Sequence, residues 1–155
     1  PVLHPLSRCL GANEIEAVSG ILNGTTNYIL TQMLENGTDY SAALRDAQSR
    51  GYAEADPTAD VEGIDAGRKA CILADLAFGR EIPPSAVSME GISRITALDA
   101  AFAAAAGMKI RLLGRAVRRD GGLFVFVAPH LVQVYVFSPA FVQVDAVVSV
   151  PLSQV

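Results

Sequence analysis

Hydrophobic residues recur at helical spacing in four parts of this chain. In the first part the apolar stripe consists of Tyr28, Ile29, Met33 and Leu34. Residues three and four positions apart share one face of a helix, so this stripe predicts a helix that buries that face. By the same reasoning, further helices are expected over residues 42–49, 60–78 and 97–106.

Polar and glycine residues indicate where these helices begin and end. Thr25 or Thr26 can cap the first helix, which should run through Leu34. Ser41 can cap the second, because a hydroxyl oxygen accepts a hydrogen bond from an N–H group of the first turn. Glycine adopts the left-handed conformation that ends many helices, so ends are expected at Asn36-Gly37, Arg50-Gly51, Gly79 and Gly107.

Short runs of β-branched and apolar residues predict strands over residues 16–22, 86–92, 109–118 and 123–129. The last two are separated by Asp120-Gly121-Gly122, which is typical of a hairpin turn. Beyond Gln133 the pattern is apolar and weakly periodic, and we expect further β-structure there. The mixture predicts an α+β fold, in which helices cover a mixed, largely antiparallel sheet.

Composition adds limits on size and partners. The 155 residues are 51% hydrophobic, which is enough for one core. The net charge of −4 gives no basic surface for nucleic acid, and no apolar run is long enough to span a membrane. Cys9 and Cys71 are far apart and lack metal-binding spacing, so both are expected to be buried, reduced thiols. Without a signal peptide, a cytoplasmic location is expected.

The two ends of the chain suggest a piece of a larger protein. It opens at Pro1 without an initiator methionine, and no basic residue follows Arg119. We expect one functional region over residues 1–132 and an apolar, β-like tail of uncertain assignment over residues 133–155.

The region richest in chemistry is an acidic segment that ends in a lysine. Its carboxylates are Glu54, Asp56, Asp60, Glu62 and Asp65, and Lys69 follows. Asp65 and Lys69 are four positions apart, so on a helix they share a face and can pair. An ammonium group, unlike a guanidinium, can give up a proton near neutral pH when its surroundings favour this.

Plainer interpretations of this segment remain open. Asp60 and Glu62 suit the first turn of a helix, where the helix dipole favours negative charge, and Asp56-Pro57 suits a turn. Lys69 can be a surface lysine. A calcium loop is also possible, although the segment lacks the alternating ligand spacing and final glutamate of an EF-hand. No nucleotide-binding glycine motif or zinc pattern occurs, and the isolated His4 and His130 are expected to be structural.

Two blocks of sequence resemble the homoserine dehydrogenase family. Residues 20–30 read GILNGTTNYIL, and residues 51–69 read GYAEADPTADVEGIDAGRK. The resemblance runs from Pro1 to about Val132. It implies the NAD(P)-dependent interconversion of L-aspartate 4-semialdehyde and L-homoserine, on the route to threonine, methionine and isoleucine.

The resemblance also implies roles for single residues. Lys69 falls on the family's catalytic lysine, which donates a proton to the aldehyde oxygen. Glu54 and Asp65 match the carboxylates that hold the substrate. Gly51 falls where the family touches its nicotinamide cofactor. The remaining matches, which line the substrate pocket, are Gly24, Thr25 and Tyr52.

Other expectations concern what surrounds this region. The family has a dinucleotide-binding domain and a sodium site upstream of the position of Pro1, and it forms homodimers through its sheet. We therefore expect these 155 residues to be inactive on their own. Two other readings stay open. One is a non-catalytic dimerisation or interaction module, and the other is a dehydrogenase that acts on a different small amino-acid aldehyde.

Overall fold

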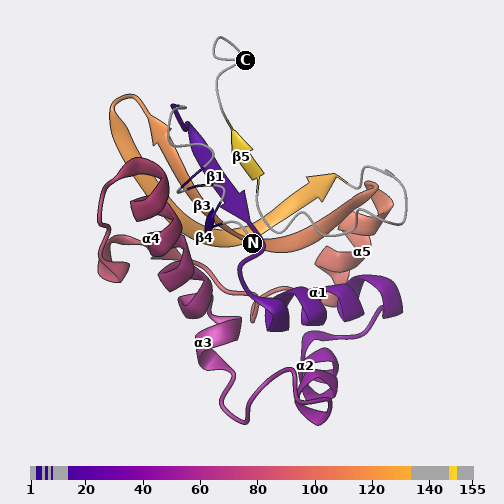
Figure 1. Ribbon diagram of the computed structural model, residues 1–155. Helices are drawn as coiled ribbons and strands as arrows, with labels where there is room; N and C mark the ends of the chain where they lie inside the picture. The colour runs from indigo at the N-terminus through magenta and orange to yellow at the C-terminus, as the bar shows by residue number, and fades with distance from the viewer. Residues whose placement is uncertain (1–2, 5, 7, 9–13, 134–146, 150–155) are drawn as a thin grey trace.

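A five-stranded mixed sheet with helices along one side forms the body of the protein (Figure 1). The computed structural model describes residues 3, 4, 6, 8, 14–133 and 147–149. The strand order is β2-β4-β3-β1-β5, and only the β2–β4 pair is parallel. The strands are β1 Ala17–Gly20, β2 Ser88–Met89, β3 Met108–Arg119, β4 Gly122–Gln133 and β5 Val147–Ser149. The predicted α+β class is confirmed.

The helices connect and cover these strands. They are α1 Gly24–Asn36, α2 Tyr40–Ser49, α3 Thr58–Val61, α4 Ile64–Phe78 and α5 Ala97–Ala105, with a 3₁₀ turn at Pro84–Ala86. No helix in the described part of the chain is long and apolar enough to cross a membrane.

The hairpin of β3 and β4 is the centre of the sheet. Asp120 and Gly121 both have positive φ angles, 50° and 74°, and Arg119 pairs with Gly122 across the turn. A two-residue loop with this geometry matches the twist of the strands that it joins. The predicted hairpin is therefore confirmed. β4 is longer than expected, because it stays paired with β3 up to Gln133.

Every second residue of β3 faces the helices. These residues are Ile110, Leu112, Gly114 and Ala116, and all are buried. The first two pack in one cluster with α1 and α5, and Ala116 packs with α4. A Cβ atom on Gly114 would lie 2.5 Å from Leu22 Cδ1, and one on Gly67 would lie 2.5 Å from Met89 Cε. Gly67 thus lets α4, the helix that carries Lys69, pack closely against Met89 of β2, and Gly114 leaves room for the Leu22 side chain.

Two predicted helix starts are wrong by a few residues. Asn23 caps α1 by accepting a 2.9 Å hydrogen bond from the Thr26 N–H, and Asp39 caps α2 through the Ala42 N–H at 2.7 Å. Both caps have extended backbone, as capping requires, whereas Thr25, Thr26 and Ser41 are already inside the helices. The expected ends at Gly37, Gly51, Gly79 and Gly107 are confirmed, and each glycine has a positive φ.

The predicted helix over residues 60–78 is two helices. Gly63 has a φ of 78° and separates α3 from α4. Glu62 closes α3, with its N–H bonded to the Thr58 carbonyl, so the expectation that it begins a helix is wrong. Asp60 does lie in the first turn of α3.

The strand predicted over residues 86–92 is also shorter than expected. Only Ser88–Met89 pairs with β4, because the chain then turns away from the sheet. Beyond β2, the N–H of Ile92 bonds to the carbonyl of Val61, which ties this loop to the end of α3 at 2.7 Å.

The predicted tail of residues 133–155 is described only at Gln133 and residues 147–149. Gln133 ends β4, and residues 147–149 form β5 beside β1. The rest of that segment lies outside the described residues, as does Cys9. Cys71 is a free, half-buried thiol. The division at residue 132 stays a prediction.

Candidate active site

Asp65 and Lys69 form an ion pair in the first turns of α4. Lys69 Nζ lies 2.6 Å from Asp65 Oδ2, as the four-residue spacing predicts. It also donates a 3.1 Å hydrogen bond to the Leu22 carbonyl, in the link between β1 and α1. An ammonium group has three N–H donors, so these two acceptors leave one donor for a ligand.

The pair remains open to solvent, since the Lys69 side chain is 49% exposed and that of Asp65 is 31% exposed. Ion pairs of this kind contribute little to stability, about 0.2–1 kcal/mol. A contribution to folding stability therefore does not explain well why a lysine stands at this position. Its accessibility allows a small polar molecule to reach the ammonium group.

The surroundings of Asp65 favour its ionised form. Partial burial acts against ionisation, but hydrogen bonds from Lys69 and Asn23 outweigh it and hold the pKa of this carboxyl below its usual value. Asp65 therefore carries a negative charge at neutral pH. The structure keeps a charged acceptor beside the lysine.

Asn23 joins this pair to two other elements. Its Nδ2 atom donates to Asp65 Oδ2 at 2.9 Å and to Asp60 Oδ1 at 2.7 Å, while its Oδ1 atom caps α1. The side chain thus connects the N-termini of α1, α3 and α4. The sequence pattern predicts a strand that ends before Asn23 and places Asp60 only in the first turn of a helix, so it assigns neither residue to this site. One sequence signal could have revealed the role of Asn23: asparagine is a good helix cap, and this one directly follows a predicted strand.

A second group of predicted residues meets at the N-terminus of α1. The Thr25 hydroxyl donates to the Tyr52 carbonyl at 2.7 Å, which brings α1 against the loop after α2. The Tyr28 ring lies on the Tyr52 ring, with 4.7 Å between centroids. The Tyr28 hydroxyl donates to Asp46, and this bond raises the tyrosine pKa, so that it stays a donor. Gly24 and Tyr52 are exposed beside this contact.

Gly51 and Glu54 lie on the same loop as Tyr52, and both are exposed. Gln48 holds the loop by donating to the Glu54 backbone carbonyl at 3.0 Å. Among the hydrogen bonds of the described residues, none joins the Glu54 carboxylate to Lys69 or Asp65. The structure therefore brings Asp65 and Lys69 into contact, and Thr25 and Tyr52 into contact. The Glu54 carboxylate, on the neighbouring loop, has no hydrogen bond or ion pair with any residue that the structure describes.

Asp56 belongs to the turn, as predicted. Its carboxylate accepts hydrogen bonds from the hydroxyl and N–H of Thr58, which lower its pKa. In the described residues, no group of three or more His, Cys, Asp or Glu side chains is arranged to hold a metal ion.

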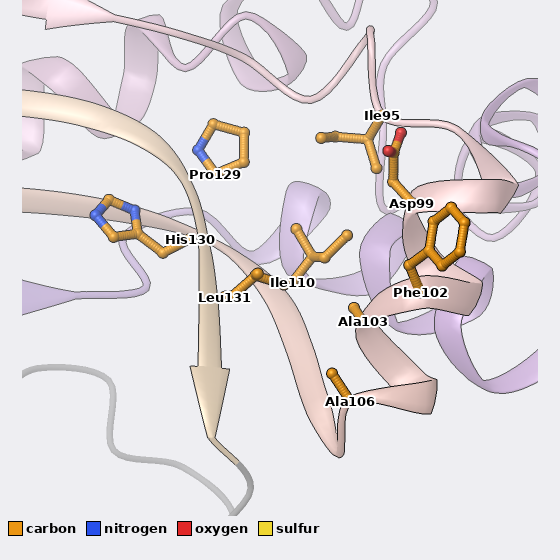
Figure 2. A pocket seen from close by; sticks show the side chains of 9 residues that line it. All are labelled: Ile95, Asp99, Phe102, Ala103, Ala106, Ile110, Pro129, His130 and Leu131. Carbon is orange, nitrogen blue, oxygen red and sulfur yellow. The ribbon is translucent and has the colours of Figure 1, made fainter.

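A cavity of about 320 Å³ lies away from these residues, between α5 and the end of the β3–β4 hairpin (Figure 2). Phe102 of α5 lines one side, and Pro129 and His130 of β4 line the other. Its lining is largely apolar and includes no member of the acidic segment. Asp99 and His130 also line this pocket, but Lys69 and Asp65 do not, so the pocket is separate from the site at the ion pair.

An accessible ammonium group held in this way can donate to an oxygen atom of a small polar ligand, which is an arrangement that enzymes use for proton transfer. A cation placed beside an oxygen that gains negative charge stabilises that charge and can then supply the proton. Comparison with known proteins identifies the family of this chain. The sequence profile of homoserine dehydrogenase matches residues 1–150, so the chain belongs to the homoserine dehydrogenase family.

Curated relatives support the assignment. The homoserine dehydrogenase of Synechocystis sp. is 50% identical over 113 residues, which are 73% of this chain and 26% of that protein. The Neisseria gonorrhoeae homoserine dehydrogenase is 43% identical over 132 residues, 85% of this chain and 30% of that protein. The chain thus spans between 26% and 30% of the length of these two relatives.

Solved structures share the fold as well. A homoserine dehydrogenase from Thiobacillus denitrificans superposes with a TM-score of 0.89 at 40% identity, covering 97% of this chain and 35% of that chain. A hyperthermophilic archaeal homoserine dehydrogenase in complex with NADPH gives a TM-score of 0.75 at 28% identity, covering 98% of this chain and 43% of that one.

Proposed function

We propose that the protein interconverts L-aspartate 4-semialdehyde and L-homoserine with a nicotinamide cofactor, and that this chain supplies its proton donor and much of its substrate site. The observation that carries the proposal is the Asp65–Lys69 pair, partly exposed and tied to Asn23 and Leu22 of the link between β1 and α1, in a chain of this family. The pathway to threonine, methionine and isoleucine, and a cytoplasmic location, belong to the same proposal.

Lys69 is the proposed proton donor. The N–H left over after its bonds to Asp65 and Leu22 is directed to the aldehyde oxygen, and the positive charge stabilises the alkoxide that forms there. In the reverse direction, the neutral amine form of Lys69 takes the proton of the homoserine hydroxyl and becomes the ammonium again. The hydrogen bond to Asp65 holds the Lys69 side chain in place in both directions.

The substrate also carries an ammonium and a carboxylate. Asp65 Oδ1 and the Glu54 carboxylate have no hydrogen bond among the described residues, so both can accept from the substrate ammonium. The N-terminus of α1, at Gly24 and Thr25, favours an anion because its first N–H groups lack partners within the helix. Tyr52 closes this side of the proposed pocket.

Gly51 is the proposed contact of the chain with the cofactor. It is exposed, and nothing lies within 4 Å of the place where a Cβ atom would stand, so a flat ring can approach its backbone. When bound, the nicotinamide supplies the hydride. NADP and NAD both remain candidates. The sodium site is proposed to lie upstream of Pro1.

A homodimer is proposed through the face of the sheet opposite the helices. That face presents Val117, Phe124 and Phe126, and Phe124 is 58% exposed. Arg115 lies over the Phe126 ring, 5.7 Å from its centroid. Apolar faces of this kind usually have a partner. The mass of the full-length protein in solution tests this, because a monomer would contradict it.

Steady-state assay of the full-length protein tests the function. We expect NADPH or NADH oxidation with L-aspartate 4-semialdehyde, and reduction of the oxidised cofactor with L-homoserine. L-Serine, one methylene shorter, should be a poor substrate. A well-folded protein that turns over neither natural substrate would exclude the enzyme and favour the interaction module. Preference for a different amino-acid aldehyde would favour another dehydrogenase.

A further inference from the structure

We propose that Asn23 is a positioning residue of this site, whose amide holds Asp65 in the one orientation that aims Lys69 at the substrate. The inference rests on the proposed function and extends it to a residue with no direct part in proton transfer. It stands on three hydrogen bonds that one buried side chain makes to three elements.

The orientation of the Asn23 amide is fixed by the helix that it caps. Its Oδ1 atom accepts from the Thr26 N–H at 2.9 Å and lies 3.0 Å from the Thr26 hydroxyl. A backbone N–H can only donate, so the oxygen must face α1 and the NH₂ group must face the carboxylates. The capping bond therefore determines which atom Asp60 and Asp65 meet.

The two N–H groups of this amide are both used. One donates to Asp60 Oδ1 at 2.7 Å, and the other donates to Asp65 Oδ2 at 2.9 Å. The Asn23 side chain is buried, with 5% of the residue exposed, so water cannot readily replace these donors. The neutral Asn23 amide therefore allows the Asp60 and Asp65 carboxylates to lie near each other although, among the described residues, Lys69 is the one cation bonded to either of them.

Lys69 depends on this arrangement because its acceptor is the same oxygen. Asp65 Oδ2 receives Lys69 Nζ at 2.6 Å as well as the Asn23 amide. The second contact of Lys69, Leu22, directly precedes Asn23 in the chain. Without the amide, Asp65 can rotate about its side-chain bonds, and the ammonium loses one of its two fixed acceptors.

The pH dependence follows from the same bond. The hydrogen bond from Asn23 is one of the causes that lower the Asp65 pKa, so removing it moves this pKa upward. Asp65 must be ionised to hold Lys69. As the pH is lowered, a variant without the amide should therefore lose activity at a higher pH than the natural protein does.

Asn23→Ser and Asn23→Asp in the full-length protein test the proposal. Serine and aspartate are both good caps, so α1 keeps its start, but neither can donate to two carboxylates. For Asn23→Ser we expect a roughly tenfold to hundredfold lower kcat, the usual scale for a misplaced group, with the KM for NADPH unchanged. The acidic limb of the kcat/KM profile should move to higher pH. Asn23→Asp, which adds a third carboxylate, should move it further.

Asn36→Ser is the matched control, at the exposed far end of the same helix. It should leave kcat and the pH profile as they are. An unshifted acidic limb in both Asn23 variants, or a loss of activity that only follows loss of folded protein, would overturn the proposal. Lys69→Ala in the same assay separates the two ideas: if it abolishes turnover while the Asn23 profile is unshifted, the function stands and the positioning role fails.

Discussion

Replacement of Lys69 by alanine is expected to lower kcat of the full-length protein at least about a thousandfold, with little change in cofactor binding. In the proposed mechanism, the lysine supplies both the proton and the charge that stabilises the forming alkoxide. General acid catalysis alone is worth about 10²–10⁴ in rate, and loss of one oxyanion partner costs about 10²–10³. Rate measurements with L-aspartate 4-semialdehyde, together with titration of NADPH fluorescence, check both parts of the prediction.

The chain offers a matched control in its other lysine. Lys109 is bonded to Glu35 at 3.3 Å, at the start of β3 and outside the proposed site. Lys109→Ala should keep nearly all activity. Lys69→Arg tests whether charge alone is enough, because a guanidinium is not deprotonated near neutral pH, and it should remain strongly impaired. A Lys69→Ala variant with kcat within tenfold of the natural protein would remove this residue from the mechanism.

Replacement of Gly91 by alanine is expected to destabilise the fold by about 3 kcal/mol, at the upper end of the usual range for overpacking. A Cβ atom at this position would lie 2.1 Å from the Val61 carbonyl oxygen and 2.5 Å from the Glu62 Cα. Both neighbours are backbone atoms and cannot turn aside as a flexible side chain would. The loop after β2 would have to separate from α3 and break the Ile92–Val61 hydrogen bond.

Denaturant unfolding compares this variant with Gly24→Ala. A Cβ atom on Gly24 meets nothing within 4 Å, and the residue opens α1 without a positive φ. Since alanine favours a helix more than glycine does, this control should be as stable as the natural protein or up to about 1 kcal/mol more stable. Equal stability of the two variants would show that the close contact between Gly91 and α3 is wrong.

Features that depend on neighbouring residues could be predicted from the sequence. Gly37 and Gly79 end their helices because the left-handed conformation costs glycine little, and Asp120-Gly121 forms the hairpin for the same reason. The choice between neighbouring caps could not be predicted. Asn23 and the threonines after it are all good caps, and the structure decides by giving Asn23 the extended backbone.

Gly63 shows the limit for longer elements. The apolar positions on both sides of it continue with helical spacing, so one helix was expected. In the structure its left-handed backbone turns the chain where a Cβ atom would lie 3.2 Å from Val127 of the sheet. Gly63 and Val127 are far apart in the sequence, so the pattern of residues around Gly63 cannot predict this contact.

The candidate site divides in the same way. The Asp65–Lys69 pair follows from a spacing of four residues. Asn23 is separated from Asp60 by 37 positions and from Asp65 by 42, and only the packing of α1 against α3, and of α3 against α4, brings them together. The resemblance to the family led to Lys69, and the structure adds the buried amide that holds its partner.

A crystal structure of the full-length protein with L-homoserine and oxidised cofactor tests the central claim most directly. We predict that the substrate hydroxyl lies within hydrogen-bond distance of Lys69 Nζ, about 2.7–3.2 Å, while Lys69 keeps its bond to Asp65. L-Homoserine bound with its hydroxyl away from Lys69, or in a site that does not include Asp65, would contradict the account.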